Sequence, residues 1–254
     1  MGGQGQELIR VEGLTSAFGQ ETVLEDISFN VMHGEVFVIL GGSGSGKSTL
    51  LKHMIGLLKP QKGRVLINGE DIVAASGESR QRILRKFGVM YQSGALFGSM
   101  TLLENVRLPL EEFTQLPAEA MDLIALMKLK LVGLAPFAHH LPAETSGGMQ
   151  KRAGIARAMV LDPEILFLDE PSAGLDPGTS ADLDELILKL AQTLKITFVI
   201  VSHELASIFK VADRAVMLDK RSKTIIAEGR PAELRAASTH PLVRQFFNRE
   251  PSRT

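Results

Sequence analysis

The sequence contains no cysteine and carries no excess of charge of either sign. Without cysteine, disulfides and thiolate metal sites are excluded, and the chain suits a reducing compartment. Its 28 Lys and Arg residues nearly balance its 29 Asp and Glu residues, so the formal net charge is −1. No global basic field therefore attracts nucleic acid or an anionic membrane, and we expect no nucleic-acid partner.

Long apolar runs are also lacking. No uninterrupted apolar stretch approaches the length of a membrane span. Residues 1–6 show no charged and then apolar signal sequence, and Gln6 stands where N-myristoylation needs Ser or Thr. We therefore expect a cytoplasmic chain that reaches a membrane only through a partner. Its 254 residues suffice for one large α/β domain with a buried core.

The chain does contain a phosphate-binding loop. Residues 41–48 read Gly-Gly-Ser-Gly-Ser-Gly-Lys-Ser, which fits G-x-x-x-x-G-K-[ST] without mismatch, and an apolar strand pattern precedes them. Glycines let backbone N–H groups approach phosphate oxygens, and the following helix adds its positive N-terminal end. Lys47 is placed to reach the β- and γ-phosphates, and the Ser48 hydroxyl to ligate Mg²⁺. We predict that the loop binds a nucleoside triphosphate through Gly41, Gly42, Ser43, Gly44, Ser45, Gly46, Lys47, Ser48 and Thr49.

The order of apolar patterns predicts an α/β fold. Apolar runs at residues 36–40, 87–91, 165–168 and 197–201 are typical of buried parallel strands, with helical patterns between them. Residues 8–11, 23–31 and 64–67 instead predict a small antiparallel sheet. The fold class is therefore a P-loop NTPase core with a small antiparallel β subdomain.

Two further segments have distinct patterns. Residues 93–159 are helical in pattern: Thr101 and Glu104 form a capping box for a helix through Leu110, and Pro117 suits the first turn of a helix through Met127. The tail from residue 236 carries apolar residues at helical spacing, which we expect to pack on another surface. The phosphate loop occurs once, which excludes tandem cassettes.

The strand pattern at residues 165–168 ends in two adjacent carboxylates, Asp169 and Glu170. Beside a phosphate loop, Asp169 can lie near Mg²⁺ while Glu170 faces an attacking water. Asp-Glu after a strand is also common as a surface turn, so the phosphate loop is what gives the pair its meaning.

At this point the chain resembles the ATP-binding-cassette (ABC) ATPases over nearly its whole length. Ser146-Gly147-Gly148-Met149 looks like the family signature, and Thr145 and Met149 stand where the family commonly has Leu and Gln. The other matching elements, in family order, are Phe18, Gln92, residues 172–176 and His203. The resemblance implies an ATPase domain over residues 7–245, a helical subdomain at about 93–160 and a C-terminal extension at 236–254.

The resemblance also implies a role for each matching residue. Phe18 stacks on adenine, Gln92 touches Mg²⁺ or the attacking water, and His203 donates to the γ-phosphate. Lys47, Gln92, Glu170 and His203 are then the catalytic residues, and Ser48, Gln92 and Asp169 hold Mg²⁺. Read alone, Phe18 could be core, Gln92 a strand-end cap and His203 a surface histidine.

Ser146, Gly147 and Gly148 lie where a helix is expected to begin, which favours an anion site. The family builds composite sites in a head-to-tail dimer, so the resemblance implies that this site binds the γ-phosphate of ATP held by a second copy.

One segment points to a subfamily. Residues 92–97 and 101–106, with Ser-Gly-Gly-Met and residues 201–205, look like the ATPases of Mla-type phospholipid transporters. This implies a permease partner bound at the cytoplasmic face of the inner membrane through the segment from Gly94 to Asn105, and accessory lipid-transport subunits. Leu96 and Phe97 would supply apolar contact, while Gly94, Ala95 and Gly98 keep a groove open; alternatively these residues complete the local core.

Two other functions stay open. The ATPase of a transporter for another small substrate would share every catalytic residue and differ in the partner-facing segment. A non-transport ABC ATPase would usually show a coiled-coil insertion or two cassettes, and neither is present. A GTPase lacks support because there is no Asn-Lys-x-Asp motif.

Overall fold

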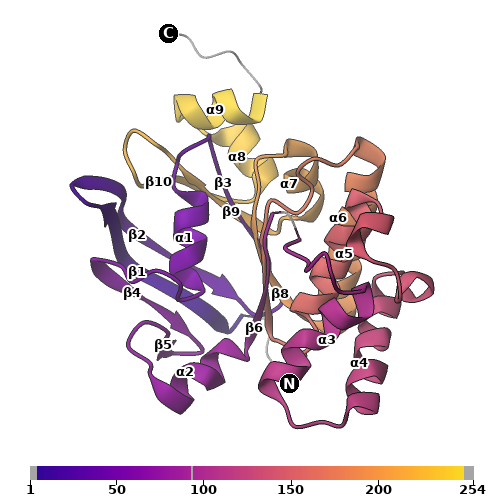
Figure 1. Ribbon diagram of the computed structural model, residues 1–254. Coiled ribbons are helices and arrows are strands. Elements are labelled where there is room, and N and C mark those ends of the chain that lie inside the picture. The colour runs from indigo at the N-terminus through magenta and orange to yellow at the C-terminus, as the bar shows by residue number, and fades with distance from the viewer. Residues whose placement is uncertain (1–4, 93, 249–254) are drawn as a thin grey trace. The chain divides into compact units, whose positions relative to one another are not determined.

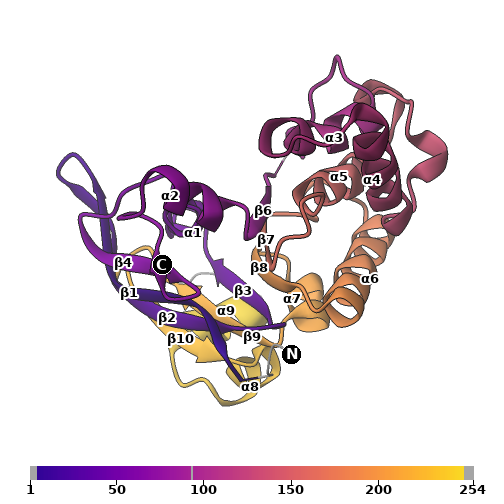
Figure 2. The ribbon, with the colours of Figure 1, turned by 90° about the horizontal axis from the view of Figure 1, so that it is seen from below.

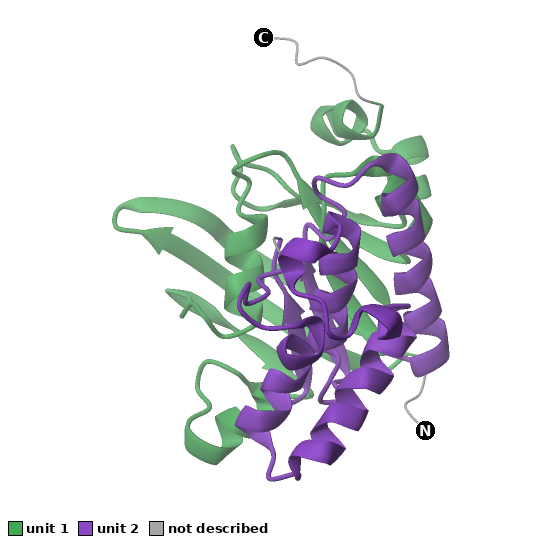
Figure 3. Cartoon of the chain, turned by 45° about the vertical axis from the view of Figure 1, so that its right-hand side comes forward, with its two compact units in different colours: residues 1–84, 197–254 green, residues 85–196 purple. Residues whose placement is uncertain are grey.

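The computed structural model describes residues 5–92 and 94–248. The chain divides into two compact units, shown in different colours in Figure 3. Unit 1 comprises residues 1–84 and 197–254, and unit 2 comprises residues 85–196. Both units contain strands and helices, in agreement with the α/β class predicted from the sequence.

Unit 1 contains an antiparallel sheet with the strand order β2-β1-β4-β5. Its strands are β1 (Glu7–Phe18), β2 (Glu21–Met32), β4 (Lys62–Ile67) and β5 (Glu70–Asp71). β1 and β2 form a hairpin that turns at Gly19, whose φ of 61° suits glycine. The predicted antiparallel sheet is confirmed, although β1 and β2 are longer than the sequence pattern indicated.

Four further strands of unit 1 lie in the order β10-β9-β3-β8. They are β3 (Val36–Gly41), β8 (Thr197–Val201), β9 (Arg214–Leu218) and β10 (Ile225–Gly229). β3 pairs in parallel with both β8 and β9, while β10 pairs antiparallel with β9. Every residue of β3 and β8 is buried, which explains why both strands are continuous apolar runs in the sequence.

The helices of unit 1 include those of the C-terminal tail. They are α1 (Lys47–Met54), α2 (Gly77–Leu84), α7 (Leu205–Val211), α8 (Pro231–Ala237) and α9 (Pro241–Asn248). Figure 1 shows α8 and α9 next to each other. Val243 and Phe247 are buried, and the Phe247 ring centroid lies 5.6 Å from that of Phe209 on α7. The prediction that the tail packs on another surface is confirmed for α9, whereas residues 249–254 of the extension lie outside the described residues.

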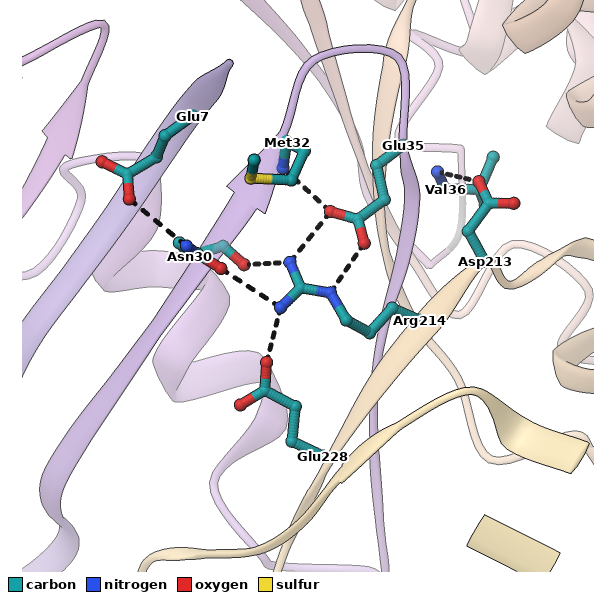
Figure 4. Close-up of polar contacts among 8 residues, drawn as sticks. All are labelled: Glu7, Asn30, Met32, Glu35, Val36, Asp213, Arg214 and Glu228. Atoms are coloured by element: carbon teal, nitrogen blue, oxygen red, sulfur yellow. Dashed lines mark hydrogen bonds and ion pairs between the residues drawn. The ribbon is translucent and has the colours of Figure 1, made fainter. Parts of the chain in front are cut away.

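Arg214 of β9 joins β2, β10 and the residue before β3 through its guanidinium (Figure 4). Its Nε and Nη2 donate to the Glu35 carboxylate just before β3, at 2.8 and 3.0 Å. It also donates to the side chain and main chain of Asn30 on β2 and to Glu228 on β10. The Glu35 carboxylate raises the pKa of Arg214 by hydrogen bonding, against the effect of burial. This network ties β2, β9 and β10 to the start of β3.

Unit 2 has two parallel strands, β6 (Phe87–Met90) and β7 (Ile165–Asp169), in register from Phe87 opposite Ile165 to Met90 opposite Leu168. Its helices are α3 (Leu102–Phe113), α4 (Ala118–Leu131), α5 (Gly147–Ala158), α6 (Pro177–Leu194) and the short 3₁₀ helices η1 (Ala135–Phe137) and η2 (Pro142–Glu144). Figure 2 shows α3, α4 and α5 gathered together.

The capping-box start predicted in unit 2 is confirmed, whereas the other predicted helix ends are shifted, and α4 continues beyond Met127 to Leu131. Thr101 Oγ1 accepts from the Glu104 N–H and the Glu104 carboxylate accepts from the Thr101 N–H, so the capping box is present. α3 continues beyond Leu110 to Phe113 with Pro109 inside it. Pro117 is the N-cap of α4 rather than a residue of its first turn, because its ψ of 151° is extended.

Candidate nucleotide-binding site

The phosphate loop leaves the end of β3 and leads directly into α1. Gly41 ends the strand, and Gly46 is the N-cap of the helix with φ of 93°. A Cβ on Gly41 would lie 2.5 Å from the Leu218 carbonyl oxygen, and one on Gly46 would lie 2.7 Å from a Leu24 methyl carbon. A side chain at Gly41 would therefore force the backbone away from β9, and one at Gly46 would have to displace the Leu24 side chain of β2. Glycine keeps the loop N–H groups uncovered, as phosphate binding needs.

Lys47 lies over its own loop. Its ammonium donates to the carbonyl oxygens of Gly41 and Gly42 at 3.0 and 3.1 Å. Ser48, the second residue of α1, is exposed, whereas Ser45 is buried. The buried Ser45 Oγ has no hydrogen-bond partner among the described residues, so the loop contains one unsatisfied polar atom. The loop thus combines a local cation with uncovered donors, which fits a polyphosphate.

The parallel register brings other residues of unit 1 to the same end of β3. Ile39 pairs with Val201, so His203 emerges next to the loop from β8, and the Ser202 N–H donates to the Ile39 carbonyl at 3.2 Å. Gly41 pairs with Leu218, so Lys220 follows from β9. The predicted His203 is exposed at this edge.

Lys220 is a residue that sequence reasoning missed. Its Nζ lies 3.6 Å from the position that a Cβ on Gly44 would take, so a second cation borders the phosphate loop. The signal that could have found it is the apolar run at β9, because strands parallel to β3 end at the same edge.

Phe18 ends β1 at the tip of the hairpin and is 56% exposed. Phe18 is therefore not a core residue, which leaves the adenine contact as the remaining interpretation. An exposed ring fits stacking on a base, whose flat face can cover it.

In unit 2, the ends of β6 and β7 place Gln92 and the two carboxylates at one edge. Met90 pairs with Leu168, so Gln92 and Glu170 each follow two residues beyond that pair. Glu170 has φ of 49°, which is unusual for a residue with a side chain and turns the chain sharply after Asp169. Burial raises the pKa of Tyr91, and the charge of Asp169 raises it further.

The Lys151 side chain of α5 reaches this edge. Its ammonium donates to the Gln92 carbonyl and lies 3.4 Å from the Glu170 carbonyl oxygen. Burial lowers the pKa of Lys151, while the charges of Glu170 and Asp169 oppose that effect. The same ammonium therefore links the segments after β6 and β7.

The signature residues lie at the start of α5, as predicted. Ser146 is the N-cap, and its Oγ accepts from the Met149 N–H at 3.3 Å. Ser146 and Gly147 are exposed, so the first N–H groups of the helix face outward. Gly148 is buried against α6, where an added Cβ would lie 2.4 Å from the Thr179 side chain. An exposed helix N-terminus of this kind fits an anion.

The segment expected to meet a permease has a rigid interior and an exposed tip. Asn105 is fully buried; its Oδ1 accepts from the Phe97 N–H at 2.7 Å, and its Nδ2 donates to the carbonyls of Phe97, Met100 and Thr101. Phe97 is 52% exposed and is not core. Gly94 is buried against the Gln150 carbonyl of α5, so it does not line an open groove as the sequence suggested.

The predicted site residues thus fall into two groups. Unit 1 carries Phe18, the loop from Gly41 to Thr49 and His203; unit 2 carries Gln92, Asp169, Glu170 and the start of α5 at Ser146, Gly147 and Gly148. Within residues 5–92 and 94–248 no three His, Asp or Glu side chains cluster as a metal site.

The sequence of this chain matches the family described as ABC transporter over residues 24–173. The chain belongs to the ABC transporter family. It is an ATP-binding subunit that hydrolyses ATP, and its fold is that of the ABC ATPase domain. Among the described helices of this ABC ATPase, none combines the length and apolarity needed to cross a membrane.

Two relatives have informative names. The chain is 44% identical to the "Probable ribonucleotide transport ATP-binding protein mkl" of Mycobacterium leprae, over 94% of this chain and 68% of that protein. It is 39% identical to the "Intermembrane phospholipid transport system ATP-binding protein MlaF" of Escherichia coli strain K12, over 95% of this chain and 88% of that protein.

Two solved structures share the fold. The cbiO1 subunit of Clostridium perfringens, part of the ABC transporter complex cbiONQ, superposes with a TM-score of 0.82 at 29% identity, covering 91% of both chains. The dimeric bacterial ABC transporter cassette MJ0796 gives a TM-score of 0.79 at 32% identity, covering 88% of this chain and 98% of that one.

Proposed function

We propose that this ABC ATPase energises phospholipid transport through a separate membrane permease, at the cytoplasmic face of the inner membrane. The observation that carries the proposal is the extent of the similarity to E. coli MlaF, which includes nearly all of both chains. The tail supports it as well, because α9 belongs to the region that resembles the Mla-type extension and is packed in unit 1.

The phosphate loop holds the triphosphate in this proposal. Its N–H groups and the N-terminal end of α1 meet the phosphates, and the Lys47 ammonium exchanges its loop carbonyls for phosphate oxygens. The exposed ring of Phe18 stacks on the adenine. Mg²⁺, held by Ser48, Gln92 and Asp169, would neutralise charge on the phosphates.

Glu170 acts as the general base. Its carboxylate accepts a proton from the water that attacks the γ-phosphate, and His203 donates a hydrogen bond to that phosphate. Gln92 orients the attacking water. The support in unit 2 is that β6 and β7 end at one edge with Gln92 and Glu170 on it.

The second copy of the chain supplies the signature. We infer that Ser146 and the N–H groups at the start of α5 bind the γ-phosphate of ATP held by the partner copy. The exposure of Ser146 and Gly147 supports this, as does the dimeric state of the similar cassette MJ0796. Ser146→Arg should then abolish the ATP-induced dimer that Glu170→Gln accumulates, as measured by light scattering; equal dimerisation of the two variants contradicts the shared site.

The permease contacts the segment from Gly94 to Asn105 through Phe97. A half-exposed aromatic ring on a loop pinned by the buried Asn105 is a rigid apolar contact. Phe97→Asp adds a charge that is costly to desolvate in such a contact, so the variant should fold and bind ATP yet no longer co-purify with the permease. A fully active complex of this variant contradicts the assignment.

A ribonucleotide is the competing cargo, because the M. leprae relative carries that name at 44% identity. The deciding experiment purifies the tagged chain with its native membrane complex and reconstitutes it in vesicles that contain fluorescent phospholipid. ATP-dependent phospholipid movement that is lost in Glu170→Gln supports the proposal. Stimulation of ATP hydrolysis by a ribonucleotide added as cargo besides ATP, with no phospholipid movement, favours the alternative.

A further inference from the structure

Two basic side chains of α5 point at main-chain carbonyls of unit 2 and not at carboxylates. Lys151 donates to Gln92 and approaches the carbonyl of Glu170 to 3.4 Å. Two turns further along α5, Arg157 donates from Nη1 to the Ala95 carbonyl at 2.8 Å and from Nη2 to the Gly94 carbonyl at 2.9 Å. All four carbonyls belong to the segments that follow the paired strands β6 and β7.

These contacts fall on strained backbone. Glu170 has φ of 49° and Ala95 has φ of 47°, in the left-handed region that residues with a Cβ rarely adopt. Such a conformation persists only where the surroundings fix it. Here one cation from α5 lies at the carbonyl of each strained residue. The two turns are therefore held by the same helix.

The placement of Lys151 is itself costly. The residue is only 6% exposed, and removing an ammonium from water is unfavourable unless it is paired or well hydrogen-bonded. Arg152, its neighbour in the same helix, instead reaches Asp182 at 3.7 Å, and that carboxylate is largely exposed. Arg152 therefore already supplies the helix surface with positive charge, so surface charge does not explain the buried ammonium of Lys151.

We propose that Lys151 and Arg157 are positioning residues for ATP hydrolysis, which hold the Glu170 turn and the segment from Gln92 to Ala95 in one fixed arrangement. The inference rests on the proposed function, in which Glu170 is the general base and Gln92 orients water. Movement of α5 then carries both segments with it, so the permease-facing loop and the base respond together.

Lys151→Met keeps an unbranched side chain of similar size and removes its charge. In the complex purified from native membranes, turnover with Mg-ATP should fall on the order of tenfold to a hundredfold, the scale expected when a reacting group is misplaced by about an ångström. The dissociation constant of a fluorescent ATP analogue should stay within about twofold, and Lys151→Arg should recover part of the rate. Arg152→Met is the matched control and should keep parental turnover.

Arg157→Met gives a second, independent test. If Arg157 acts by holding Ala95 at positive φ, then Ala95→Gly should restore much of the turnover, because glycine adopts that conformation without strain. This pair also keeps the proposal falsifiable if Lys151→Met fails to fold. Parental turnover in Lys151→Met, equal loss in Arg152→Met, or no rescue by Ala95→Gly would each overturn the proposal.

Glu170→Gln separates this inference from the function on which it rests. Active Glu170→Gln would refute the general-base role whatever Lys151 does. Inactive Glu170→Gln together with fully active Lys151→Met would refute only the positioning role.

Discussion

Gly88 in the middle of β6 has no space for a side chain, and replacing it tests the packing that brings α5 to the site. A Cβ at this position would lie 1.7 Å from the Ala158 carbonyl oxygen and 2.5 Å from its carbonyl carbon. Gly88 does not have positive φ, so the change Gly88→Ala adds no backbone strain of its own. The whole effect of the substitution is therefore steric.

The size of the effect follows from that distance. Since non-bonded heavy atoms pack best at about 3.5 Å, the end of α5 must move on the order of 1.5–2 Å away from β6 to accept the methyl group. Overpacking of a core typically costs about 1–3 kcal/mol, and a clash with backbone cannot be relieved by rotating a side chain. We expect the free energy of unfolding to fall by about 3 kcal/mol, which corresponds to a loss of about 6–12 °C in Tm for a chain of this size.

Urea titration and thermal unfolding followed by circular dichroism measure both quantities. Gly98→Ala is the matched control, because nothing lies within 4 Å of the added Cβ and its φ is not positive, so the stability should change by less than about 0.5 kcal/mol. Adding Ala158→Gly to Gly88→Ala should give no rescue, since the clashing atoms are backbone. A Gly88→Ala protein with parental Tm, or one rescued by Ala158→Gly, would refute the reasoning.

The remaining predictions concern one network, one histidine and one loop. Arg214→Met should lower the free energy of unfolding by about 3 kcal/mol in urea titration, because it leaves the Glu35 carboxylate, 11% exposed, without its cationic partner; Arg10→Met, which breaks an exposed pair with Glu7, should lower it far less. Burial lowers the pKa of His53, so below about pH 6.5 the unfolded chain binds a proton that the folded chain does not. The free energy of unfolding should therefore fall as the pH drops below 6.5, by up to about 1.4 kcal/mol per pH unit. His53→Gln should flatten this slope in urea titrations at several pH values. Asn105→Ala removes one accepted and three donated hydrogen bonds, so amide hydrogen exchange in the loop that ends at residue 101 should accelerate. Exchange in β7 should stay unchanged. Unchanged exchange in the loop would contradict the role of Asn105 in holding it.

The features that could be predicted from the sequence are those fixed by neighbouring residues. The phosphate loop needs only a strand, glycines and a helix start in succession, and the capping box at Thr101 needs only Glu104 three residues later. Buried parallel strands such as β3 and β8 show themselves as continuous apolar runs. Each of these signals is complete within about ten residues.

The features that could not be predicted depend on segments distant in the sequence. β10 is a partly exposed strand whose register is fixed by β9. Whether Phe18 was core or exposed depended on how far β1 extends into its hairpin. The carbonyl partners of Lys151 are 59 and 19 residues away from it in the sequence, and the helical pattern of α5 does not predict them.

Close approach explains why α5 can link these segments at all. A Cβ on Gly154 would lie 3.2 Å from Met90 of β6 and 3.3 Å from the Cα of Gly94, and one on Gly94 would lie 3.2 Å from the Gln150 carbonyl. With Gly88, these glycines let helix and strand pack backbone to backbone, at a distance that the Lys151 side chain can span to reach a main-chain carbonyl. Closely packed elements transmit displacement and do not absorb it. An anion bound at the first turn of α5 would therefore shift the segment after β6 together with the helix.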